Sequence, residues 1–423
     1  MYFVICTLTK GVAILNKASI DFDAVRFYGM TLEEMDEEFK KMKDYGIDAV
    51  NIEYKIFIDK EFEIFKENIL ACIKFNRMQI IFRSRPIDGY YTDYIDDEQY
   101  QKSLVKHKQF LYTLYNILEE RDIKRGVKVI FAGGKCESGE IEKHIEKNIS
   151  FFKELSSSVL DIDFEILTEV QAARPIRGRI VGDTWSDFLY MIDAIPNENW
   201  GICWSTASSR LNFVEYNETL IPDKKILDKV KLANVRNNIN QNFDISIYKN
   251  EVQEQEIKAL IINGYNNVFN LEYIYVHLEN SNISHNDIYD GIYYLQCVLN
   301  YFRKKHEQEE LYIINDIAKM NRQSIRTVLT KDIIVSIPIK SLELNEIEIA
   351  THSLKIWSEK NIVFKEDEEI QIEIKYKEDE PIILNTKYMM CREEGKFRGY
   401  VFKIIDKKPD IIKNVYKLVY LVG

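Results

Sequence analysis

The sequence predicts an α/β protein in which a (β/α)8 TIM barrel is followed by a small antiparallel β-barrel domain. Short β-branched apolar runs alternate with longer amphipathic segments up to residue 307, and eight such units fit one closed barrel. From residue 311 onward, alternating segments separated by acidic turns predict the second part. A chain of 423 residues is also long for a single core. We therefore expect two domains, residues 1–307 and 308–423.

Eight apolar runs are the predicted barrel strands, and a helical segment follows each one. The runs are Tyr2–Leu8, Ile47–Tyr54, Gln79–Ser84, Val127–Ala132, Phe164–Val170, Gly201–Ser205, Lys231–Arg236 and Val268–Glu272. The helix after the sixth run, near Asp223–Val230, is expected to be short. An open doubly wound sheet is the main alternative. No GxGxxG motif follows any run, which disfavours the dinucleotide-binding form of that alternative.

Several helix starts carry a side-chain oxygen that can bond the backbone N–H groups of the first turn. The pairs are Thr31 with Glu34, Thr184 with Asp187, and Ser284 with Asp287. Gly46 is the predicted C-terminal stop of the first of these helices. The last helix of the first domain is expected at about residues 284–306.

In the second domain, five segments alternate apolar and polar residues as half-buried strands do. They are Ile333–Ile337, Ser353–Trp357, Glu369–Tyr376, Ile382–Met390 and Tyr400–Ile405. A closing helix is expected at Pro409–Tyr416.

Composition narrows the classes of function. No window holds the roughly 18 uncharged apolar residues that a membrane helix needs, and Met1–Thr9 is too short for a secretory signal. We therefore expect a cytoplasmic protein with no membrane span. A net charge of −11 argues against a nucleic-acid polymer as partner, although a few arginines can still hold a small anion. The six cysteines include no CxxC pair, so buried free thiols are expected rather than a zinc site.

Chemistry in a β/α barrel is expected at the C-terminal ends of the strands. The residues at those ends are Glu169, Ser205 and Ser208, Arg236, and Glu272. From the residues alone, two interpretations stay open. They form a functional site, or they form a polar network that covers the end of the barrel.

Two of these strand ends carry a resemblance to a known family. The segment WGICWSTASSRLNF resembles the strand-six signature of the sugar phosphate isomerase/epimerase (xylose-isomerase-like) family, which ends in Asp-Thr-Gly-His. Here that tetrad reads Ser205–Thr206–Ala207–Ser208. The segment VKLANVRNN resembles the next strand, where the family has His-x-His and this chain has Asn234 and Arg236. Glu169 in ILTEV and Glu272 in VFNLEY match the family's two metal-binding glutamates.

The resemblance implies a divalent metal held by Glu, Asp, His and Glu, which polarises a sugar carbonyl while carboxylates move a proton. Serines replace two of those four ligands, so we expect no tight metal site and no other cofactor. Arg236, placed near Glu169 and Glu272, would replace the cation electrostatically. The barrel is then a degenerate relative of these isomerases, and whether it is an enzyme stays open.

A group of arginines lies at other strand ends and in one loop. They are Arg83, Arg85, Arg174, Arg177 and Arg179. Such a cluster suits a phosphorylated or carboxylated small molecule through bidentate contacts, and it suits a solvated loop equally well.

The second domain carries a different resemblance. The segments NRQSIRTVLTKDIIVSIPI and IEIATHSLKIWSEKNIVFKEDEEIQIEIKY resemble the opening of a PilZ domain, the bacterial receptor module for cyclic di-GMP. Arg322 and Arg326 match its RxxxR motif. Of its D/N-x-S-x-x-G motif only Ser353 is retained, and Ile356 stands at the glycine position. In that context two arginines would bind phosphate oxygens and guanine edges, and Ser353 would add a hydroxyl. Two exposed surface arginines are the simpler explanation.

Three hypotheses of function follow. The first is a bacterial regulatory or ligand-binding protein that responds to cyclic di-GMP and carries a non-catalytic barrel. The second is an active sugar phosphate isomerase or epimerase with a rearranged site. The third is a structural scaffold whose partners are proteins. Fold alone does not decide among them, because function depends on the site.

Overall fold

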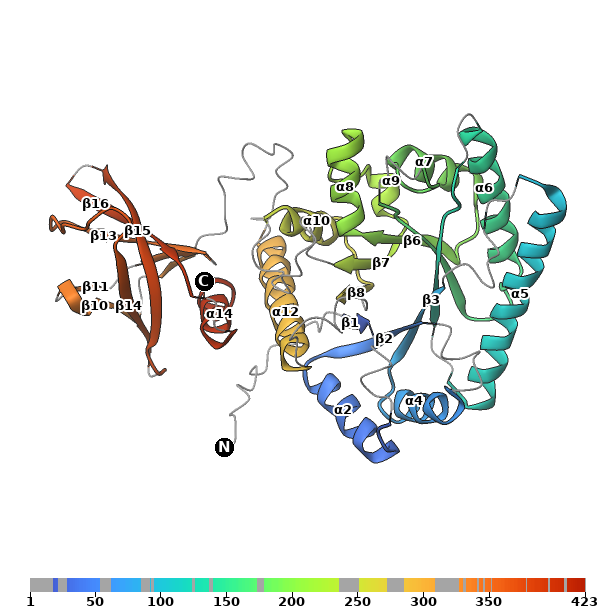
Figure 1. The fold of residues 1–423 in the computed structure, drawn as a ribbon, viewed down its shortest axis with the longest axis horizontal. Helices are drawn as coiled ribbons and strands as arrows, with labels where there is room; N and C mark the ends of the chain where they lie inside the picture. Colours follow the sequence, from blue (N-terminus) through green and yellow to red (C-terminus); the bar gives the residue numbers. More distant parts are fainter. Residues whose placement is uncertain are drawn as a thin grey trace. The chain divides into compact units, whose positions relative to one another are not determined.

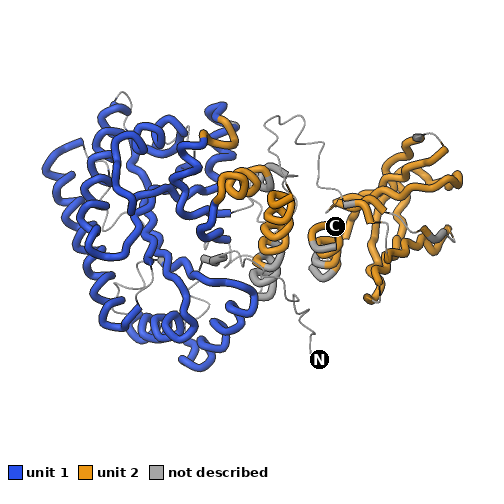
Figure 2. Tube along the Cα trace, turned by 180° about the vertical axis from the view of Figure 1, so that it is seen from behind, with its two compact units in different colours: residues 1–218, 224–235, 265–275 blue, residues 219–223, 236–264, 276–423 orange. Residues whose placement is uncertain are grey.

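The computed structural model describes residues 18–21, 29–53, 62–84, 92, 95–123, 126–136, 140–172, 179–235, 251–271, 285–308, 327–329, 332–340, 342–344, 347–350, 352–377, 379–394, 396–406 and 409–422. Contacts divide the chain into two units. The first comprises residues 1–218, 224–235 and 265–275, and the second residues 219–223, 236–264 and 276–423 (Figure 2). Among the described residues, no helix is long and apolar enough to cross a membrane.

The first unit is a closed barrel of parallel strands (Figure 1). The strands are β1 (Ala18–Asp21), β2 (Ile47–Glu53), β3 (Gln79–Ser84), β4 (Val127–Ala132), β5 (Phe164–Glu169), β6 (Trp200–Ser205), β7 (Val230–Val235) and β8 (Val268–Leu271). They pair in sequence order, and β1 closes the barrel by pairing with both β2 and β8. The predicted barrel is confirmed, and the predicted positions of β2 to β8 are correct to within about two residues at each end.

The first strand differs from its prediction. The barrel place between β2 and β8 is filled by β1 at Ala18–Asp21, whereas we predicted the strand at Tyr2–Leu8. Residues 2–8 lie outside the described part of the chain. The residues of Tyr2–Leu8 are more apolar and so predict a buried strand more strongly. Strand β1 has only four residues, and two of them are polar, so its sequence gives little indication of a strand.

Helices surround the barrel strands of this unit (Figure 1). They are α2 (Leu32–Asp44), α4 (Glu63–Phe75), α5 (Asp97–Glu120), α6 (Ile141–Ser157), α7 (Trp185–Ala194), α8 (Thr206–Tyr216) and α9 (Lys224–Leu227). Thr31 and Glu34 form the predicted capping box, and Thr184 caps α7 through the Asp187 N–H. The predicted start at Ser284 lies outside the described residues.

Helix α8 was not predicted. It has 11 residues and begins directly after β6, whereas we expected only a short helix near Asp223–Val230, where α9 lies. Its first turn is Thr-Ala-Ser-Ser, and serine and threonine favour caps and turns over helix interiors. Helix α8 therefore places Ser205 and Ser208 at a strand-to-helix junction.

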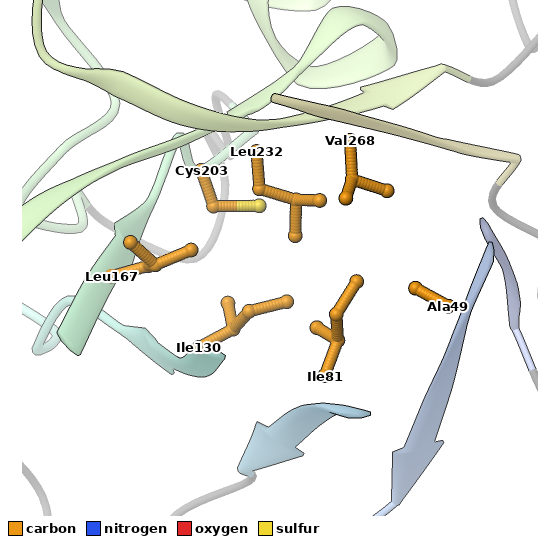
Figure 3. Packing of buried hydrophobic residues seen from close by; sticks show 7 residues of the cluster. All are labelled: Ala49, Ile81, Ile130, Leu167, Cys203, Leu232 and Val268. Atoms are coloured by element: carbon orange, nitrogen blue, oxygen red, sulfur yellow. The ribbon is translucent and has the colours of Figure 1, made fainter. Parts of the chain in front are cut away.

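Seven buried side chains from β2 to β8 fill the middle of the barrel. They are Ala49, Ile81, Ile130, Leu167, Cys203, Leu232 and Val268. Figure 3 shows these side chains pointing toward one another from strands around the barrel. Because strand residues alternate between two faces, residues two positions away on each strand also point inward.

Before this apolar layer, a charged cluster lies at the N-terminal end of the strands. Lys128 and Glu165 precede the layer by two positions on their strands, and Lys231 precedes it by one. Lys128 is buried and forms an ion pair with Glu165, and Lys231 Nζ lies 2.8 Å from the other Glu165 oxygen. Burial would raise the pKa of Glu165, but the two lysines keep it below its ordinary value. Gly201 leaves room for Lys231, since a Cβ there would lie 2.6 Å from the Lys231 Cδ. Ionic and apolar layers thus fill the barrel below its C-terminal end.

The second unit contains α10 (Glu251–Ile262), α12 (His285–Glu307), an antiparallel sheet, α14 (Pro409–Tyr416) and a π-helical segment at Lys417–Val422. Its strands are β9 (Thr327–Leu329), β10 (Ile333–Ile337), β11 (Leu342–Leu344), β12 (Ile347–Ala350), β13 (Ser353–Ser358), β14 (Glu369–Tyr376), β15 (Ile382–Glu394) and β16 (Phe397–Ile404). The Tyr301 ring of α12 packs edge-on against Tyr420, so α12 contacts the C-terminal segment.

The sheet order is β11-β10-β14-β15-β16-β13-β12-β9, with β11 and β9 as its edges. The antiparallel domain is confirmed, but the described strands form an open sheet rather than the expected small barrel. The five predicted strands and the closing helix are present. The domain boundary at residue 307 stays a prediction, and α12 groups by contacts with the second unit.

Four of the cysteines are buried and free, as predicted, but Cys391 is exposed. Cys6 lies outside the described residues.

His107 on α5 makes the stability of the first unit depend on pH. It is buried against Phe131 and Phe151, and this burial lowers its pKa to about 4. The unfolded chain therefore binds a proton near pH 6.5 that the folded chain excludes, so stability falls between about pH 6.5 and 4. We expect His107→Phe to remove roughly 3 kcal/mol of this loss.

Urea unfolding at pH 7 and pH 4.5 measures this difference, with tryptophan fluorescence as the signal. The exposed His306 provides the control through His306→Gln. An identical pH dependence in wild type and His107→Phe would contradict the prediction.

Candidate ligand-binding site at the barrel mouth

One step above the apolar layer, the barrel interior becomes polar. The residues two positions after the seven core residues are Asn51, Arg83, Ala132, Glu169, Ser205, Asn234 and Asn270. By strand alternation these residues face the interior at the C-terminal ends of the strands. Six of the seven are polar or charged, at the end of the barrel where ligands bind in this architecture. We refer to these seven residues as the polar layer.

Glu169 is at the centre of the hydrogen bonding in the polar layer. Its Oε1 oxygen forms an ion pair with the guanidinium of Arg83, which lies two strands away on β3. Asn234 Nδ2 donates a hydrogen bond to the same Oε1 at 3.3 Å. Gln171 Nε2 lies 3.5 Å from the second oxygen, Oε2. The side chains of Arg83 and Glu169 are 27% and 13% exposed, so the pair is largely shielded from water. Oε1 is fully engaged, and Oε2 has the remaining capacity to accept a hydrogen bond.

A chain of amides fixes the orientation of Asn234. Asn270 Nδ2 donates to Asn234 Oδ1 at 3.0 Å, so the Asn234 nitrogen must face Glu169. Both asparagines are fully buried. A buried network of this kind holds the Glu169 carboxylate in one place before any ligand arrives.

Ser205 and Ser208 lie where β6 becomes α8. Ser205 is the N-cap residue of α8, yet its side chain makes no capping bond to the helix. The Ser208 hydroxyl donates to the Ser205 hydroxyl at 3.1 Å. The structure therefore brings both predicted serines to the barrel mouth, where they present hydroxyl groups.

Arg179, a member of the arginine cluster, bonds to residues of its own segment and of the start of α7. Its Nε donates to Asp183 at 3.1 Å and its terminal nitrogen to Thr184 at 2.7 Å, with a further bond to Asp187. Burial would lower the pKa of Arg179, but Asp187 and Asp183 keep it above its ordinary value. These bonds hold the segment between β5 and α7 in place.

That segment crosses the end of β4. Val181 N–H donates to Gly134 O at 2.9 Å, and Cys136 N–H donates to Arg179 O at 2.8 Å. Gly133 is needed here because a Cβ would lie 1.9 Å from the Val181 carbonyl oxygen. This backbone contact lies directly after Ala132, the polar-layer residue of β4.

The remaining predicted site residues fall outside the described part of the chain. They are Arg236, Glu272, Arg85, Arg174, Arg177, Arg322 and Arg326. Ser353 is described and half-buried as the first residue of β13. Ile356, at the glycine position of the motif, is fully buried on the opposite face of the strand. The cyclic di-GMP site therefore stays a prediction.

Sequence reasoning missed three polar residues of this region: Asn51, Gln171 and Asn270. Asn51 and Asn270 lie on predicted strands, two positions after Ala49 and Val268 of the apolar layer. Strand alternation would identify them once the inward face of each strand is known. Gln171 lies beyond the end of β5, and no periodic signal marks it.

The polar layer does not fit a metal centre. Within the described residues, no group of three or more His, Cys, Asp and Glu side chains is placed to hold a metal ion. The layer has one carboxylate, Glu169, and a guanidinium already pairs with it. Serine and asparagine side chains are weak neutral ligands for the metals that isomerases use.

Comparisons with known proteins return solved barrel structures. No protein-family model matches the chain, and no curated protein matches it. A structure of L-ribulose 3-epimerase is 12% identical and covers 70% of this chain and 98% of its own, with a TM-score of 0.49. D-Psicose 3-epimerase from Clostridium cellulolyticum H10 is 12% identical over 68% of this chain and 98% of its own, with a TM-score of 0.48. A D-tagatose 3-epimerase-like protein is 14% identical over 69% and 99%, with a TM-score of 0.46.

The Arg83–Glu169 pair should show strong energetic coupling. Arg83→Leu leaves the shielded Glu169 carboxylate without its cation and should destabilise the first unit by about 1–3 kcal/mol. Adding Glu169→Gln should recover part of that loss, because no unpaired charge then remains. Urea unfolding of the four proteins in a double-mutant cycle measures the coupling. Additive effects of the two substitutions would show that the pair does not interact.

Proposed function

We propose that the barrel binds a small polyhydroxylated molecule at its C-terminal end, and that it does so without a divalent metal. The observation that carries this proposal is the position of Arg83. The guanidinium neutralises Glu169 at the place where the family resemblance would put a metal ion. It supplies positive charge and planar donors, but it does not coordinate as a Lewis acid.

The other groups of the polar layer support the same ligand class. Amides and hydroxyls from Asn51, Ser205 and Ser208 can each donate or accept hydrogen bonds, as the hydroxyls of a sugar or polyol require. Glu169 Oε2 can accept a bond from a ligand hydroxyl. The buried Asn270–Asn234 chain keeps the Glu169 carboxylate in position through its other oxygen, Oε1.

Binding without turnover is the form of function that these residues favour. Metal-dependent isomerisation is the alternative, and it requires Glu272 together with further metal ligands from outside the described residues. A barrel that serves only as a scaffold for protein partners would need no ligand at all.

Thermal shift measurements test the proposal. Protein treated with EDTA should be stabilised by at least one member of a panel of sugars and polyols, including D-fructose and D-glucitol. Glu169→Gln should reduce this shift, because the amide no longer pairs with Arg83 or accepts as strongly. The exposed Glu142 on α6 gives a matched control, and Glu142→Gln should leave the shift unchanged. A shift that requires added metal would contradict the proposal.

The regulatory hypothesis for the second unit has its own test. If Arg322 binds cyclic di-GMP, calorimetry should give binding heat with the wild type and weaker binding with Arg322→Ala. The exposed Arg392 on β15 serves as the control, and Arg392→Ala should bind like the wild type. No heat with the wild-type protein would remove cyclic di-GMP as a ligand.

A further inference from the structure

The buried amide nitrogen of Asn51 makes no hydrogen bond to any described residue. Asn51 is 3% exposed on β2, and its Nδ2 has no hydrogen-bond partner among the described residues. A buried donor without a partner lowers stability, and native proteins keep such groups mainly where they serve a function. Asn51 belongs to the polar layer, so its unused N–H groups lie inside the proposed ligand site.

Two positions of the barrel interior at and below the polar layer carry small side chains. The residue below Asn51 on the same strand face is Ala49, and the polar-layer residue of β4 is Ala132, so both positions have the smallest apolar side chain that strands use. Strand β2 pairs with β3, which carries Arg83. Among the described side chains of β2 and β3 at this end, the Asn51 amide and the Arg83 guanidinium both carry hydrogen-bond donors.

We infer that Asn51 binds the ligand by donating a hydrogen bond to a carboxylate oxygen, an inference that rests on the proposed function. The ligand class is then a polyhydroxy acid. A carboxylate only accepts hydrogen bonds, which suits the donors that Asn51 and Arg83 carry. Glu169 does not repel it strongly, because Arg83 already balances the Glu169 charge. Bonds to a charged acceptor are also stronger than bonds to a hydroxyl.

The first test compares two ligands that differ at one carbon. D-Gluconate and D-glucitol share a chain of hydroxyls, but one end is a carboxylate in the first and an alcohol in the second. Calorimetry on the wild-type protein should give gluconate roughly tenfold tighter binding than glucitol. Equal binding of the two compounds, or tighter binding of glucitol, would overturn the inference.

The second test separates a binding role from a structural one. Asn51→Leu removes the unsatisfied donor, so it should raise the melting temperature of the free protein while weakening gluconate binding by about tenfold or more. Asn148 is the matched control, since it is a fully buried asparagine that bonds Thr92, Gly134 N–H and the His144 carbonyl. Asn148→Leu should lower the melting temperature. A lower melting temperature for Asn51→Leu with gluconate binding intact would show a structural role.

Asn51→Asp tests the direction of the hydrogen bond. The aspartate has the same shape but cannot donate when ionised, so gluconate binding should be lost. Retained binding would mean that the ligand donates to residue 51, which contradicts the inference. If both gluconate and glucitol bind in a Glu169-dependent way but Asn51→Leu changes neither, this inference fails and the proposed function stands. If no polyol or sugar binds, both fail.

Discussion

Closure of eight parallel strands into a barrel forces every second residue of each strand into one narrow interior. The chain fills that interior in steps. Lys128 and Glu165 lie at one end, the seven apolar side chains of Figure 3 lie in the middle, and the polar layer lies at the other end. Lys128 and Glu165 balance each other's charge at their end, and the middle of the interior is apolar. The polar layer lies at the end of the strands where ligands bind in this architecture.

Within the polar layer, the Arg83–Glu169 ion pair determines what the site can do. A divalent metal would bind several anionic or imidazole ligands, whereas a guanidinium needs only one carboxylate to balance its charge. The described groups around the pair are amides and hydroxyls, and we propose that they bind a polyhydroxylated ligand in place of a metal ion. The same pairing orients the Glu169 carboxylate, and hydrogen bonds through Asn234 and Asn270 connect it to β7 and β8.

The sequence was sufficient for the barrel but not for the chemistry of its site. Seven strands were predicted because apolar β-branched runs are needed wherever a strand is buried on both faces. Strand β1 and helix α8 were missed because neither has a strong apolar pattern. Glu169 and Ser205 were correctly placed at strand ends. The expectation that Arg236 lies near Glu169 stays a prediction, because Arg236 lies outside the described residues. That Arg83 pairs with Glu169 depends on how two strands come together across the barrel, which local pattern does not report.

Electron paramagnetic resonance of Mn²⁺ tests most directly whether a guanidinium takes the place of a metal. Unbound Mn²⁺ gives a strong six-line signal that weakens when a protein binds the ion. If the Arg83 guanidinium takes the place of a metal, wild-type protein should leave the signal of micromolar Mn²⁺ unchanged. If wild-type protein instead removes the signal stoichiometrically and the Glu169→Gln variant does not, then Glu169 holds a metal ion and the guanidinium does not replace it.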